Sequence, residues 1–121
     1  MKKVLVKFDE DAFEEYCELQ NKVAENKKSR VNPSYVQLLS SINNSIKNLK
    51  LDPYFGNLIP RKYLTKKVIS KYGTDKIFRV ELVGYWRLMY TVIGEETQII
   101  AFILEYVDHS EYNKLFNYKK R

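Results

Sequence analysis

Cysteine and histidine are almost absent from this chain of 121 residues, which has one of each, Cys17 and His109. A single cysteine cannot form a disulfide within the chain, and a zinc site needs several cysteines or histidines at fixed spacings. The sequence therefore excludes an internal disulfide and predicts no metal site. Cys17 lies on the apolar stripe of a predicted helix, so we expect an inert core thiol.

Long apolar runs are also missing. Hydrophobic residues make up 45% of the sequence, yet no run approaches the roughly 18 apolar residues that span a bilayer. Near the basic start of the chain, residues 4–6 are apolar, but this run is far shorter than the core of a signal peptide. We therefore expect a cytoplasmic protein that does not enter a membrane, and a single domain over residues 1–121.

Acidic residues are outnumbered by basic ones, 15 to 21, which gives a formal net charge of +6. Such an excess favours anionic partners, although a basic surface that serves only solubility is the alternative. The charge is densest in one short stretch, which makes its cations candidate RNA-binding residues. They are Arg61, Lys62, Lys66, Lys67 and Lys71. The alternative is the solvated face of an exposed helix.

The first half of the chain predicts one strand and two helices. Residues 3–8 alternate charged and apolar side chains, which is typical of a short strand. Asp11 and Glu14 form a capping box at the start of a helix over residues 11–28, and a second helix follows over residues 33–51. The apolar stripes consist of Phe13, Tyr16, Cys17, Gln20 (the one polar exception), Val23 and Ala24, and of Tyr35, Leu38, Leu39, Ile42, Ile46 and Leu49. The two helices should form an antiparallel hairpin that covers a sheet.

The second half predicts a short helix and three strands. Residues 63–72 have the spacing of a short helix, with Gly73 just beyond its end. Residues 78–82 and 86–92 alternate apolar with polar positions, as strands with one buried face do. Residues 98–107 are nearly continuously apolar, which predicts a strand in the interior of the sheet.

The register of the first two of these strands follows from their apolar faces. Directly opposite residues of an antiparallel pair share a face, so the apolar faces match only if the connecting loop has an odd number of residues. A three-residue loop over residues 83–85 satisfies this condition. It sets Glu81 opposite Arg87, and it places Arg79 on the same, more polar face as Arg87.

This order of elements resembles the RelE/ParE superfamily of bacterial and archaeal toxins from type II toxin–antitoxin systems. Residues 78–82 and 85–90 are similar to the paired arginine-bearing strands of that superfamily, and residues 51–53 fit a recurrent turn after its second helix. Residues 108–112 are similar to its closing segment, in which a histidine or arginine has an aromatic neighbour. The resemblance covers nearly the full chain. It implies an α+β fold in the order β-α-α-β-β-β, with an antiparallel sheet of about four strands and the helical hairpin packed on one face.

The RelE branch of this superfamily implies an endoribonuclease that cuts mRNA in the ribosomal A site without a metal or cofactor. Such cleavage needs a base for the ribose 2′-hydroxyl, cations for the phosphorane-like transition state and an acid for the leaving 5′-oxygen. The resemblance assigns phosphate stabilisation to Arg87, with assistance from Arg79. It assigns proton transfer to His109, because histidine takes up and releases protons near neutrality. It makes Tyr112 a residue that orients or stacks on a base, and Glu81 a candidate base.

Each assignment has a structural alternative. Glu81 and Arg87 would also form an ordinary cross-strand ion pair, which contributes roughly a few tenths of a kcal/mol. Tyr112 would also pack on Phe116 in a short terminal helix, and a lone histidine near a chain end is more often structural. Three further aromatic residues of this region are expected in the core, namely Trp86, Tyr90 and Tyr106.

The resemblance also implies partners. The RelE branch acts on mRNA and the ribosome, and a cognate antitoxin protein covers the positive charge and apolar grooves of the toxin. Two other functions remain open at this point. One is a ParE-like inhibitor of DNA gyrase that cuts no nucleic acid, and the other is an inactive RNA-binding member whose basic stretch over residues 61–71 suffices for binding.

Overall fold

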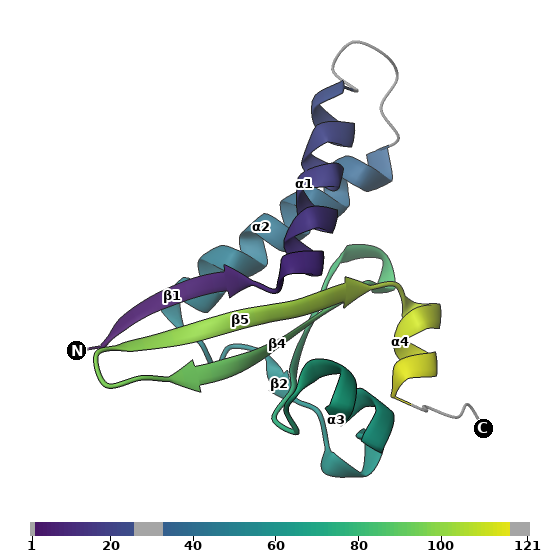
Figure 1. Ribbon diagram of the computed structural model, residues 1–121. Coiled ribbons are helices and arrows are strands. Elements are labelled where there is room, and N and C mark those ends of the chain that lie inside the picture. The colour runs from purple at the N-terminus through teal and green to yellow at the C-terminus, as the bar shows by residue number, and fades with distance from the viewer. Residues whose placement is uncertain (1, 26–32, 117–121) are drawn as a thin grey trace.

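The computed structural model describes residues 2–25 and 33–116 and shows helices on both faces of one sheet (Figure 1). The helices α1 and α2 lie on one face, and the shorter helices α3 and α4 lie on the other. The elements are β1 (Lys3–Phe8), α1 (Glu10–Glu25), α2 (Pro33–Leu51), β2 (Asn57–Leu58), the 3-10 turn η1 (Arg61–Tyr63), α3 (Lys66–Tyr72), β3 (Phe78–Glu81), the 3-10 turn η2 (Val83–Tyr85), β4 (Arg87–Gly94), β5 (Gln98–Val107) and α4 (His109–Leu115). Within the described residues, no helix is long and apolar enough to cross a membrane.

Helix α1 is capped by Asp9, and the predicted capping box at Asp11 is wrong. The carboxylate of Asp9 accepts a hydrogen bond from the backbone N–H of Asp11 over 3.2 Å, and its carbonyl accepts the N–H of Phe13 over 2.8 Å. The N–H of Asp9 still donates to the carbonyl of Ile103 in β5 over 2.7 Å. The chain therefore passes from strand to helix within one residue, which leaves no room for the later cap. The predicted end at residue 28 lies outside the described residues.

The buried face of α1 differs in part from the predicted stripe. Ala12 and Leu19 are the buried residues of this helix, whereas Phe13 is 52% exposed. Of the predicted stripe, Tyr16, Cys17 and Val23 are half-buried, and Phe13, Gln20 and Ala24 are exposed. The buried face of the helix is therefore centred about one residue earlier than the predicted stripe, on Ala12 and Leu19 in place of Phe13 and Gln20. The small side chain of Ala12 allows the helix to approach the sheet closely. In α2 the predicted stripe is buried or half-buried from Leu38 to Leu49, and only Tyr35 at its start is exposed.

The sheet has five strands in the order β1-β5-β4-β3-β2. The antiparallel pairs β3·β4 and β4·β5 are as predicted, and β5 lies in the interior with a neighbour on each side. Two features correct the prediction of an antiparallel sheet of about four strands. Strand β1 joins β5 in parallel, because the two long helices return the chain to the other end of the sheet, and the two-residue strand β2 adds an antiparallel edge to β3.

The hairpin between β3 and β4 has the predicted register. Glu81 lies opposite Arg87 and Val80 lies opposite Leu88 in the ladder, and the N–H of Leu82 donates to the carbonyl of Trp86 over 2.8 Å. The loop is η2, which has the three predicted residues. Its odd length keeps the apolar residues of both strands on the face that α1 and α2 cover.

Each face of the sheet has its own core. The α1/α2 face is built from Ile42, Leu49, Val80, Leu88, Tyr90 and Ile103 among others, with Trp86 packed against it and Tyr106 buried in it. The α3/α4 face is built from Ile59, Val68, Ile77, Met89, Leu104, Val107, Tyr112 and Phe116. The expected core placement of Trp86, Tyr90 and Tyr106 is therefore confirmed. Arg79 and Arg87 project on the α3/α4 face, beside Met89.

The segment between α2 and β3 packs tightly against the sheet at Gly56. A Cβ atom at this position would lie 2.6 Å from the carbonyl oxygen of Arg79 and 2.8 Å from the ring of Tyr90. The N–H of Gly56 donates to the hydroxyl of Tyr90 over 2.8 Å. Only glycine fits this approach, which fixes the backbone at Arg79. Further along, Gly73 ends α3 in the left-handed conformation, as the sequence predicts.

Candidate functional site

The ring of Tyr112 lies against two guanidinium groups. The Cζ atoms of Arg79 and Arg87 lie 5.9 and 5.4 Å from the ring centroid, and Nη1 of Arg79 donates a hydrogen bond to the Tyr112 hydroxyl over 2.8 Å. Both arginines are half-buried. The structure thus brings together the two arginines that the register placed on one face and the tyrosine of the closing segment. Cation–π contact of this kind holds like-charged groups near one another.

The guanidinium of Arg87 donates hydrogen bonds through Nη1, whereas its Nε donates none to the described residues. Its Nη1 donates to the backbone carbonyls of Tyr85 and Trp86, over 2.9 and 3.4 Å. Its Nη2 lies 3.8 Å from a carboxylate oxygen of Glu81, and its buried Nε has no hydrogen-bond partner among the described residues. A buried N–H without a partner is costly and calls for an explanation. The Nε and Nη2 donors form the fork that binds two oxygens of a phosphate or carboxylate.

The candidate proton-transfer groups lie on opposite sides of Arg87 across the sheet. Arg87 pairs with Glu81 of β3 on one side and with Val107 of β5 on the other. His109 follows Val107 by two residues and is exposed. The carboxylate of Glu81 is also exposed, at 67%, so its ion pair with Arg87 contributes little to stability and leaves the group accessible.

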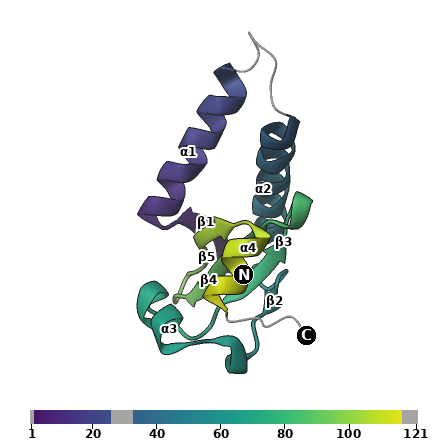
Figure 2. The same ribbon diagram turned by 90° about the vertical axis from the view of Figure 1, so that its right-hand side faces the viewer.

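Helix α4 positions both His109 and Tyr112. The carboxylate of Asp108 accepts the N–H of Glu111 over 2.9 Å and so begins the helix directly after β5. His109 is the first helical residue, and its Nε2 lies 3.2 Å from Nδ2 of Asn113 one turn later. Tyr112 lies on the opposite, buried side and packs on Phe116 at 4.7 Å between ring centroids. Figure 2 shows α4 in front of the sheet.

The expected stacking role of Tyr112 on an RNA base does not fit its burial. The residue is 2% exposed, and its ring is enclosed by Phe116 and the two guanidinium groups. The geometry instead gives Tyr112 a positioning role, through its hydrogen bond to Arg79 and its contact with Arg87. The sequence contains a signal for this arrangement, because Asp108 and Glu111 have the spacing of a capping box that places Tyr112 one turn inside a helix.

The residue that the sequence analysis missed is Tyr85, at the tip of the β3–β4 hairpin. It is 74% exposed, and its ring centroid lies 6.0 Å from that of His109. Its carbonyl accepts the hydrogen bond from Nη1 of Arg87. Tyr85 therefore contacts both Arg87, through its carbonyl, and His109, through its ring. Its backbone φ of 64° is left-handed, which is uncommon for a residue with a Cβ atom.

The basic stretch lies on η1 and α3, on the same face of the sheet as Arg79 and Arg87. Two of its five cations are in ion pairs: Arg61 with Asp75 at 3.2 Å and Lys71 with Glu105 at 3.4 Å. Lys62 lies over the ring of Tyr63, 5.1 Å from the centroid. Lys66 and Lys67 are exposed and pair with no acidic side chain within the described residues. They are therefore the most available cations of this stretch.

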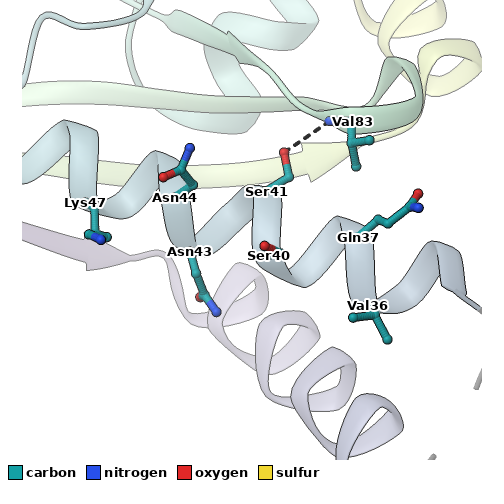
Figure 3. A pocket seen from close by; sticks show the side chains of 8 residues that line it. All are labelled: Val36, Gln37, Ser40, Ser41, Asn43, Asn44, Lys47 and Val83. Carbon is teal, nitrogen blue, oxygen red and sulfur yellow. Dashed lines mark hydrogen bonds between the residues drawn. The ribbon is translucent and has the colours of Figure 1, made fainter.

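Of two pockets, one adjoins the site and the other does not. A small pocket of about 220 Å³ adjoins the arginine strand at the β2 edge and is lined by Phe55, Gly56, Asn57, Arg79, Val80 and Glu81. A pocket of about 620 Å³ lies on α2, on the other face of the sheet, where its one charged lining residue is Lys47 (Figure 3). This second pocket contains none of the predicted site residues. Over residues 2–25 and 33–116, no group of three or more His, Cys, Asp or Glu side chains could hold a metal ion.

Comparison with solved structures finds the same fold in a YoeB/ParE toxin from Agrobacterium tumefaciens. The two structures have a TM-score of 0.50 with 15% sequence identity, over 90% of this chain and 99% of the toxin chain. The chain therefore has the fold of a YoeB/ParE toxin. No protein-family model matches the sequence, and no curated protein matches it. The likeness confirms the predicted α+β class and superfamily fold, and at this identity it concerns the fold and not the activity.

Proposed function

We propose that this RelE/ParE-type protein is the toxin of a type II toxin–antitoxin system, and that it cleaves mRNA on the ribosome and so inhibits translation. The observation that carries the proposal is the pair Arg79 and Arg87 around Tyr112, with the buried Nε of Arg87 lacking a hydrogen-bond partner among the described residues. Two neighbouring guanidinium groups suit the extra negative charge of a phosphorane-like transition state.

The chemistry is transesterification at the scissile phosphate. A base removes the proton of the ribose 2′-hydroxyl, the 2′-oxygen attacks phosphorus, and the bond to the 5′-oxygen breaks as an acid protonates that oxygen. The products are a 2′,3′-cyclic phosphate and a 5′-hydroxyl end. Arg87 binds the nonbridging oxygens, and Arg79 adds charge from the position that Tyr112 fixes. No step in this scheme requires a metal ion or cofactor.

Proton transfer is assigned to the two exposed groups that flank Arg87. His109 lies beyond β5 and Glu81 lies on β3, so the attacking and leaving oxygens of one phosphate at Arg87 would face different groups. We assign His109 as the acid and Glu81 as the base. Lys66 and Lys67 on α3 supply contacts to neighbouring phosphates of the RNA. The expected partners are the ribosome with its mRNA and a cognate antitoxin, and the expected location is the cytoplasm.

The proposal is tested by inducing the wild-type protein, Arg87→Ala and His109→Ala in cells, then mapping mRNA ends and growth. Lys47→Ala is the matched control, because it removes a cation on the opposite face of the sheet. We expect growth arrest and new cuts within translated codons for the wild type and the control, and neither for the two site variants. Circular dichroism of the purified variants checks that they fold.

The same experiment distinguishes the alternatives. Arrest without mRNA cuts, together with loss of DNA supercoiling, would replace the proposal by a ParE-like inhibitor of gyrase. Absence of arrest, with RNA binding that is lost on reversing the charge of Lys66 and Lys67, would replace it by an inactive RNA-binding protein.

A further inference from the structure

Tyr85 has an unusual combination of exposure and backbone conformation. Its ring is 74% exposed at the tip of the β3–β4 hairpin, and its φ of 64° makes it the one residue other than glycine with positive φ in the described chain. This conformation is unfavourable for a residue with a Cβ atom. An unfavourable conformation of this kind, when held by its surroundings, points to a function.

The surroundings hold Tyr85 firmly. At the start of the loop, the N–H of Val83 donates to Oγ of Ser41 in α2 over 3.1 Å, a contact drawn as a dashed line in Figure 3. At its end, the Leu82 N–H donates to the carbonyl of Trp86 over 2.8 Å. The carbonyl of Tyr85 itself accepts Nη1 of Arg87 over 2.9 Å. The loop conformation therefore aims the carbonyl at the arginine and the ring outward.

The ring is placed beside the proposed chemistry. Its centroid lies 6.0 Å from that of His109, with 54° between the planes, so one neighbour of the exposed ring is the proposed acid. The backbone carbonyl of Tyr85 contacts Arg87, which is the proposed phosphate ligand. An exposed aromatic ring next to a phosphate site is the arrangement by which proteins bind unpaired RNA bases, because every base has a flat face that stacks.

We propose that Tyr85 is a base-stacking residue, which takes up an unpaired nucleobase next to the phosphate bound by Arg87. The inference rests on the proposed function and deepens it, because it makes the hairpin tip, and not the buried Tyr112, the aromatic contact for RNA. Stacking needs the ring and not the hydroxyl. It also tolerates any base, so Tyr85 contributes to affinity and alignment more than to codon choice.

The test compares Tyr85→Phe and Tyr85→Gly with the wild type in cleavage of mRNA bound to purified ribosomes with an empty A site. Glycine adopts positive φ without strain, so Tyr85→Gly should keep or raise the melting temperature while it removes the ring. We expect Tyr85→Phe to cleave within about twofold of the wild type and Tyr85→Gly to cleave at least about tenfold more slowly at subsaturating enzyme. Ile93→Ala, which truncates an equally exposed (41%) apolar side chain near the other end of β4, is the control and should match the wild type.

A second arm replaces single nucleotides around the cut by abasic ones. One abasic position should slow the wild-type protein about as much as Tyr85→Gly does, and should slow Tyr85→Gly no further, since both remove the same interaction. Cleavage by Tyr85→Gly at the wild-type rate would overturn the inference while the proposed function stands. Weaker antitoxin binding without a change in cleavage would assign the ring to a protein interface and also overturn it. A wild-type protein that cuts no RNA would refute the proposed function itself, and the inference with it.

Discussion

Arg79 and Tyr112 are joined by a hydrogen bond of 2.8 Å between Nη1 and the phenolic oxygen, although 33 positions separate them in the sequence. The bond connects β3 to α4, so the helix that begins with His109 also fixes the second cation of the site. Tyr112 is buried and Arg79 is half-buried, so the bond lies in a partly buried environment, where a hydrogen bond is electrostatically stronger than in water. The geometry of the proposed active site thus depends on the docking of a short terminal helix.

This relationship predicts different outcomes for two substitutions of Tyr112. Tyr112→Phe keeps the packing on Phe116 and removes only the hydrogen bond from a charged donor, so we expect stability to fall by about 1 kcal/mol and cleavage to fall about tenfold. Tyr112→Ala removes a buried ring and should cost about 3–5 kcal/mol in stability. Urea unfolding and single-turnover cleavage measure the two effects. Unchanged cleavage by a folded Tyr112→Phe protein would refute the positioning role.

The cations of η1 and α3 should contribute unequally to RNA binding. Arg61 and Lys71 are in ion pairs, whereas Lys66 and Lys67 pair with no described acidic side chain. We expect Lys66→Ala with Lys67→Ala to weaken binding of single-stranded RNA more than Arg61→Ala with Lys71→Ala. The slope of log affinity against log salt should fall by about 1 for each phosphate that the variant no longer binds. Equal effects of the two double variants would mean that the ion pairs open on binding.

Gly56→Ala should be destabilising because a Cβ atom would lie 2.6 Å from the carbonyl oxygen of Arg79 and 2.8 Å from the Tyr90 ring. Both neighbours are held within the sheet, so we expect a loss of about 1–3 kcal/mol in thermal or urea unfolding. Gly94→Ala is the matched control, since a Cβ atom there meets nothing within 4 Å. Its stability should change by less than about 0.5 kcal/mol. A Gly56→Ala protein as stable as Gly94→Ala would contradict the close packing of Gly56 against Arg79 and Tyr90.

Stability should decrease at alkaline pH because buried tyrosines resist ionisation. Burial, with the nearby charges of Glu15 and Glu18, raises the pKa of Tyr106 to about 12, and burial with a hydrogen bond to Glu105 raises the pKa of Tyr72 further. Above the unfolded-state pKa of about 10, the unfolded chain loses protons that the folded chain keeps, so the free energy of unfolding falls as pH rises.

For Tyr106 alone we expect a loss of about 1–2 kcal/mol between pH 10 and 12. Tyr106→Phe should reduce this alkaline loss and leave the shape of the stability curve below pH 9 unchanged. Urea unfolding across pH 7–12 gives both quantities. An alkaline loss of the same size in Tyr106→Phe would show that this tyrosine is not its source.

The parts of the fold that follow from local chemistry were predictable from sequence. The hairpin register followed from the alternation in 78–82 and 86–92 and the odd loop, and the boundaries of β1 and of β5 followed from their own patterns. The parallel pairing of β1 with β5 was not predictable in this way, because no local pattern records which strand a distant strand joins. The strand β2 has only two residues and carries no period at all.

The candidate site shows the same limit. That Arg79 and Arg87 share a face followed from register, because it depends on two neighbouring strands only. The burial of Tyr112 between them depends on how α4 folds back after β5, which is a tertiary contact. The role proposed for Tyr85 was missed because a tyrosine in a loop tip looks ordinary until its backbone conformation and its distance to His109 are known.

The measurement that tests the central claim most directly is cleavage of mRNA on purified ribosomes by the wild type, Arg87→Lys and Lys47→Ala. Lysine keeps the charge of Arg87 but cannot present the Nε and Nη2 fork. We predict fragments with 2′,3′-cyclic phosphate ends from the wild type and Lys47→Ala, and a rate about 100-fold or more lower for a folded Arg87→Lys protein. Wild-type rates for Arg87→Lys, or no cleavage by the wild type, would contradict the account.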